Sequence, residues 1–92
     1  NKMLPERIEL TLTKRDFKGK FYTNPYECPV ATGLKRMFPN SLIGVSIGRC
    51  TIDDQVYVEF TKLCNCHTIQ PLIDKANSNK KVGKLTLIFE KI

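Results

Sequence analysis

The sequence predicts an α+β protein in which a small antiparallel sheet of four to five strands carries two helices on one face. Apolar and polar residues alternate near both ends of the chain, apolar residues recur at helical spacing in two internal segments, and turn-forming residues separate these stretches. The chain has 92 residues, 41% of them hydrophobic, which predicts one domain spanning residues 1–92 with a modest core.

Residues 8–13 place Ile8, Leu10 and Leu12 on one face of a strand and polar residues on the other. Residues 14–24 mix charged residues with glycine and end at Asn-Pro, which indicates a loop. Cys28-Pro29 then begins the first helix, because proline suits the first helical position, and apolar residues follow at helical spacing up to Pro39. Gly33 inside this helix costs about 1 kcal/mol relative to alanine or marks close packing.

Residues 43–47 and 56–60 alternate like strands, with Val56, Val58 and Phe60 expected on the core side and Tyr57 and Glu59 on the other. Turn signals lie at residues 48–49 and 53–54. Residues 50–52 therefore form either the end of a long hairpin arm or a short extra strand.

Thr68 is the expected N-cap of the second helix, whose apolar stripe runs from Ile69 to Ala76. Residues 85–90 alternate again and form the last strand. The resulting order, strand, helix, strand, strand, helix, strand, is that of the ferredoxin-like split unit. In that arrangement the first and last strands are antiparallel neighbours.

If residues 50–52 form a separate strand, the middle of the chain reads helix, three strands, helix. That order resembles, in topology alone, the double-stranded-RNA-binding domain with an extra strand at each end. The family's last helix opens with lysines, which would fall at residues 66–72, and no lysine or arginine stands there. The resemblance therefore implies a fold and not RNA binding.

Composition favours a cytoplasmic protein with an anionic partner. Fifteen Lys and Arg residues against nine Asp and Glu give a net charge of +6, an excess that favours association with anions. Residues 1–5 lack the continuous apolar stretch of a signal peptide, and no apolar run is long enough for a membrane helix. We therefore expect no membrane association, and four reduced cysteines.

The segment Cys64-Asn65-Cys66-His67 resembles a set of metal ligands, but we expect no metal and no cofactor. In the ferredoxin-like order, Cys28 and Cys50 fall at one end of the sheet and these three residues at the other, too far apart to share an ion. Structural zinc sites also usually leave two to four residues between paired cysteines. The segment is therefore interpreted as a strand-to-helix connection with buried or half-buried thiols.

No catalytic constellation is evident, so the protein is expected not to be an enzyme. Cys28 precedes a helix, where the dipole would lower a thiol pKa, but His67 is the one histidine and is predicted at the opposite end. Cys28 is therefore interpreted as a small buried apolar residue. Asp53-Asp54 is interpreted as a turn, and Tyr22 and Tyr26 as residues packed beside one.

Basic residues follow the first strand and precede the last, so the two groups are expected to meet where these strands are neighbours. The N–H groups of the first helix are expected to point there too, with Asp16, Asp53, Asp54 and Asp74 partly diluting the charge. The predicted anion-binding residues are Lys14, Arg15, Lys18, Lys20, Arg49, Lys80, Lys81 and Lys84.

The predicted function is therefore a small non-enzymatic binding module for nucleic-acid backbone or another phosphate-bearing ligand. The open sheet face is a poor platform for stacking RNA bases, since it is expected to carry one aromatic residue among Glu9, Thr11, Thr13, Tyr57 and Glu59. The alternative is a protein-interaction or inhibitor module. It would use a sheet edge, or a face with Ile88 and Ile92, and could pair as a homodimer.

Overall fold

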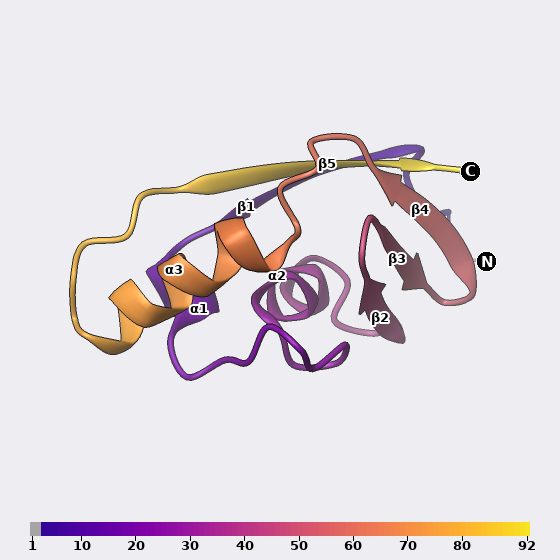
Figure 1. Ribbon diagram of the computed structural model, residues 1–92. Helices are drawn as coiled ribbons and strands as arrows, with labels where there is room; N and C mark the ends of the chain where they lie inside the picture. Colours follow the sequence, from indigo (N-terminus) through magenta and orange to yellow (C-terminus); the bar gives the residue numbers. More distant parts are fainter. Residues whose placement is uncertain (1–2) are drawn as a thin grey trace.

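The computed structural model describes residues 3–92; Asn1 and Lys2, the start of the stretch considered above for a signal peptide, lie outside the described residues. Its elements are β1 (Arg7–Leu12), α1 (Lys14–Phe17), α2 (Pro29–Met37), β2 (Ile43–Ser46), β3 (Arg49–Ile52), β4 (Gln55–Glu59), α3 (Cys66–Asn77) and β5 (Leu85–Lys91). The five strands form one curled antiparallel sheet, and the helices lie on one side of it (Figure 1). The predicted α+β class with an antiparallel sheet is confirmed.

The predicted ferredoxin-like order is not confirmed. The strands lie in the order β1-β5-β4-β3-β2, so the last strand is inserted between β1 and β4. Arg49–Ile52 is a separate strand, as in the alternative reading of the middle segment. The expected pairing of the first and last strands is present, from Arg7 opposite Glu90 to Leu12 opposite Leu85.

Tight turns join β2, β3 and β4 into a meander. Gly48 has a φ of 73°, and Asp53 and Asp54 have φ values of 48° and 71°. Two consecutive residues with positive φ are typical of the two-residue hairpin turn that matches the twist of the flanking strands, and aspartate is among the residues that tolerate it. The pair of aspartates thus forms the predicted turn.

The core lies between the sheet and the helices. Ile8, Leu10 and Leu12 of β1 are buried there, as their alternation predicts. Gly33 of α2 lies directly against this strand, because a Cβ atom built at Gly33 would be 2.6 Å from Leu12 Cδ2. The glycine therefore marks close packing of a helix on a strand.

The predicted orientation of β4 is wrong. Tyr57 and Glu59 are buried on the core side, at 0% and 3% exposure, while Val56 and Val58 lie on the open side. The Tyr57 hydroxyl donates to the Pro5 carbonyl at 2.5 Å.

Glu59 organises the connection from β4 to α3. Its carboxylate accepts hydrogen bonds from the backbone N–H groups of Leu63, at 2.8 Å, and Cys64, at 3.1 Å, and from the Thr61 hydroxyl. A buried carboxylate is costly unless such donors surround it. These donors come from the loop after the strand, so the alternation of β4 alone could not indicate the buried face.

Two helix starts also differ from the sequence prediction. A short helix, α1, lies within residues 14–24, which were expected to form a loop. Helix α3 has Asn65 rather than Thr68 as its N-cap, because the Asn65 side-chain oxygen accepts from the Thr68 N–H at 3.0 Å. Cys28 precedes α2, with Pro29 as its first residue, as predicted. Among residues 3–92, no helix combines the length and the apolar character needed to cross a bilayer.

Candidate functional site

Seven of the predicted basic residues lie at one end of the molecule. Leu12 and Leu85 are opposite each other, so the segments that follow β1 and precede β5 emerge side by side. The Gly19 N–H donates to Asn77 Oδ1 at 2.8 Å, and Lys18 Nζ lies 3.5 Å from Asn79 Oδ1. Figure 1 shows α1, the C-terminal end of α3 and the segment before β5 at this end. We call this surface the basic end: Lys14, Arg15, Lys18, Lys20, Lys80, Lys81 and Lys84.

Three of the four aspartates expected to reduce the positive charge of this end do not face it as free carboxylates. Asp16 is buried and forms an ion pair with Arg36. Asp53 and Asp54 form the turn between β3 and β4. Because Tyr57, near the start of β4, pairs with Lys91 at the end of β5, this turn lies at the end of the sheet opposite to the basic end. Asp74 remains exposed on α3, where its carboxylate accepts from Gln70 at 3.0 Å.

Arg49 is not brought to the basic end. Arg49 pairs with Val58 of β4, and Val58 pairs with Glu90 near the end of β5. The basic end adjoins Leu85, at the start of the same strand. The prediction placed Arg49 with the lysines because the ferredoxin-like order would bring the hairpin turn to the same end. The β2–β3 turn still points the same way along the sheet as the end of β1, but β4 pairs only with the last residues of β5, from Phe89 to Lys91, so Arg49 stays well short of the basic end.

The first turn of α2 also points elsewhere than predicted. Its last turn approaches α1, where Arg36 contacts Asp16 and donates to the Thr11 carbonyl at 3.3 Å. The free N–H groups at the start of α2 therefore do not face the basic end. Lysine and arginine side chains, and not the N-terminus of α2, provide its positive potential.

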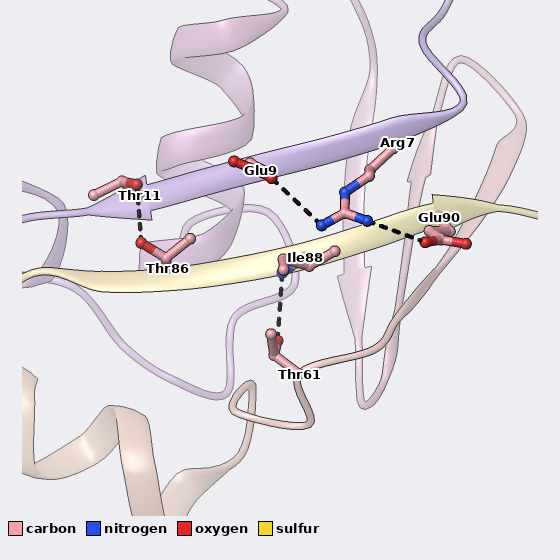
Figure 2. Close-up of polar contacts among 7 residues, drawn as sticks. All are labelled: Arg7, Glu9, Thr11, Thr61, Thr86, Ile88 and Glu90. Atoms are coloured by element: carbon pink, nitrogen blue, oxygen red, sulfur yellow. Dashed lines mark hydrogen bonds and ion pairs between the residues drawn. The ribbon is translucent and has the colours of Figure 1, made fainter.

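The open face of the sheet is polar around β1 and β5 (Figure 2). Arg7 forms ion pairs with Glu9 at 3.4 Å and Glu90 at 3.7 Å. The hydroxyls of Thr11 and Thr86 lie 3.1 Å apart across the two strands. Because Tyr57 and Glu59 are buried, the expected composition of this face was wrong, but it still presents no aromatic side chain from β1, β4 or β5.

The cysteines are arranged differently from the prediction. Cys28 and Cys64 line the same cavity, and the proximity of Cys64 contributes to the raised pKa of Cys50. The expected separation of Cys28 and Cys50 from Cys64 was therefore wrong. It assumed the ferredoxin-like order, in which the two groups fall at opposite ends of the sheet.

The three buried thiols are poor nucleophiles near neutral pH. Burial raises the pKa of Cys50 to about 12, and Cys64 and Glu59 add to the effect. Burial also raises the pKa of Cys64 to about 12, with Glu59 and Cys28 adding to it. For Cys28, burial raises the pKa although the Ala31 N–H donates to its sulfur at 3.4 Å and opposes the rise. The position of Cys28 before a helix does not activate it.

The Cys64-Asn65-Cys66-His67 segment divides between the interior and the surface. Cys64 is buried, whereas Cys66 and His67 are exposed in the first turn of α3. Within residues 3–92, no group of three or more His, Cys, Asp or Glu side chains is placed to hold a metal ion. The segment forms the connection from strand to helix.

Comparison with protein-family models, with curated proteins and with solved structures finds no match for this chain.

Proposed function

We propose that the protein is a binding module for a polyanion, such as nucleic-acid backbone, and that the basic end is its site. One observation carries the proposal: the lysine-rich segment after β1 and the one before β5, far apart in the sequence, are held side by side by the Gly19–Asn77 and Lys18–Asn79 hydrogen bonds. No ion pair among the described residues uses a side chain of the basic end. These cations therefore remain available for phosphate or sulfate groups.

The arrangement suits contacts to a backbone rather than to bases. Lysine ammonium groups act as flexible point charges that bind phosphate oxygens without sequence information. Near β1 and β5 the open sheet face is occupied by ion pairs and threonines (Figure 2), which are poor partners for stacked bases. We therefore expect binding that depends strongly on salt and weakly on sequence.

The test compares two triple variants that each remove three positive charges. K80Q/K81Q/K84Q alters exposed residues of the basic end, and K35Q/R49Q/K62Q alters exposed cations outside it. Arg36 and Lys91 are unsuitable as controls, because they form ion pairs with Asp16 and Glu6. Binding to labelled heparin and to a DNA duplex is measured by fluorescence anisotropy over a series of salt concentrations.

The basic-end variant is expected to bind more weakly at low salt and to show a shallower salt dependence, by about 0.9 in the logarithmic slope for each lost phosphate contact. The control variant should keep most of the affinity. Equal weakening of both would mean attraction by net charge without a site. If the wild-type protein binds neither polymer near physiological salt, the proposal fails, and a salt-insensitive dimer in sizing chromatography would then favour the protein-interaction alternative.

A further inference from the structure

A cavity of about 300 Å³ lies where α2, α3 and the β2–β3 turn meet. Segments from four parts of the chain enclose it, so it is a recess created by tertiary packing and not a patch on one element. It is distinct from the basic end, none of whose seven residues lines it. Its walls include Tyr22, Cys28, Val30, Val45, Cys64 and Ile69.

The lining is uncharged. It contains no Asp, Glu, Lys, Arg or His side chain, and its polar groups are hydroxyls and two thiols. Burial favours the neutral form of both thiols. An ion that entered would lose its hydration without gaining a partner of opposite charge, so the cavity selects against charged ligands.

The size and the sulfur atoms indicate the kind of neutral molecule that would fit. Ligand-binding pockets begin at about 300 Å³, and an apolar cavity of about 150 Å³ is enough to hold benzene. A cavity of this volume therefore suits a molecule with two aromatic rings. The sulfur atoms of Cys28 and Cys64 can make favourable contacts with aromatic rings, and Ile47, 82% exposed at the β2–β3 turn, adds apolar surface at the mouth.

We propose that this cavity is a binding site for one small, neutral, aromatic molecule, held between the first turns of α2 and α3. The site is independent of polyanion binding, because the two surfaces share no residue.

The first test uses 6-propionyl-2-(dimethylamino)naphthalene, a neutral probe with two aromatic rings whose fluorescence increases and moves to shorter wavelength in apolar surroundings. The full chain is expected to bind one probe saturably. Ser46 is exposed and borders the cavity, so S46F should fill the mouth without disturbing the core and should weaken binding at least about tenfold. T86F, an equally large substitution on the open face of β5, is the control and should bind as the wild-type protein does.

The second test uses the cysteines as reporters and does not depend on a substitution being tolerated. Naphthalene is added to the wild-type protein, which is then alkylated with N-ethylmaleimide and analysed by peptide mass spectrometry. Alkylation of Cys28 and Cys64 should slow severalfold in the presence of naphthalene, since both line the cavity. The exposed Cys66 should react at an unchanged rate and serves as the internal reference.

Three results would overturn the proposal: no saturable probe binding, S46F binding with wild-type affinity, or equal protection of all cysteines by naphthalene. The K80Q/K81Q/K84Q protein should bind the probe with unchanged affinity. A loss of probe binding in that variant would place the probe at the basic end and also contradict the proposal. Failure of polyanion binding would leave this proposal unaffected, because its probe is uncharged.

Discussion

The guanidinium of Arg36 forms an ion pair with the carboxylate of Asp16, whose side chain is 1% exposed. The same carboxylate accepts from the Thr13 N–H at 2.9 Å, at the start of α1. A helix of four residues has almost no stability by itself. This ion pair therefore anchors α1, and with it the first group of lysines of the basic end, to the last turn of α2.

Replacing Arg36 should destabilise the protein. R36Q leaves the buried Asp16 carboxylate without its cation, and we expect a loss of about 2 kcal/mol in the free energy of unfolding, less than for a fully buried pair because Arg36 is partly exposed. Urea denaturation measures the change. The neighbouring K35Q should change stability by less than about 0.5 kcal/mol, and D16N/R36Q should recover part of the loss. Equal stabilities of R36Q and K35Q would show that the pair contributes nothing.

Stability should fall at alkaline pH because of the buried thiols. The pKa of both Cys50 and Cys64 is raised from 9.0 to about 12 by burial, so between these values the unfolded chain loses protons that the folded protein keeps. The unfolded state then binds fewer protons, and the free energy of unfolding decreases with rising pH by up to about 1.4 kcal/mol per pH unit for each thiol. Below about pH 8, one unit under the unfolded pKa, these two groups should contribute almost no slope.

The measurement is the urea midpoint as a function of pH for the wild-type protein and for C50A. Removing one thiol should make the decline between pH 9 and about 12 shallower, although the absolute stability of C50A is lower because the side chain is buried. Tyr22 and Tyr57, whose pKa values burial also raises, add to the decline in both proteins. Identical slopes for the two proteins would contradict the role given to Cys50.

Gly33 should not tolerate a methyl group. A Cβ atom would lie 2.6 Å from Leu12 Cδ2 and 2.9 Å from Leu10 Cδ1, so G33A is expected to cost about 1–3 kcal/mol by overpacking, against a gain in helix propensity of about 1 kcal/mol. Thermal unfolding should show a lower midpoint. G83A is the control, because nothing lies within 4 Å of its added Cβ. A midpoint for G33A at or above that of the wild-type protein would mean that the two leucines move aside freely.

Local patterns predicted the elements that depend on near neighbours in sequence. The alternation of Ile8, Leu10 and Leu12 indicated both β1 and its buried face, and Cys28-Pro29 indicated the start of α2. In β4 the same argument failed, because both faces carry apolar side chains and the choice depends on Glu59 receiving donors from the following loop. Strand order depends on contacts between distant segments, which periodicity does not report.

Some parts of the candidate site could likewise be predicted from the sequence, and others could not. The lysines of the basic end were predicted correctly as neighbours because that inference required only β1 beside β5. The cysteines were misplaced because their positions required the whole strand order, and Arg49 because its position required the register of β4 on β5. The convergence of Cys28 and Cys64 on one cavity had no signal in the sequence, since it results from the packing of α2 and α3 beside the β2–β3 turn.

The insertion of β5 between β1 and β4 has a consequence for how the chain acquires its structure during synthesis. Arg7 can pair with Glu90 on the neighbouring strand only after Glu90 has been synthesised, and β4 also needs β5 to connect the meander to the rest of the sheet. Until then β1 has no strand beside it, and its apolar face must be sheltered by helices alone. Pairing between strands so far apart in the sequence slows folding, because the entropy of the long connecting chain is lost before the contacts between the strands stabilise the structure. On the ribosome, the sheet is therefore completed only after Leu85–Lys91 leaves the exit tunnel.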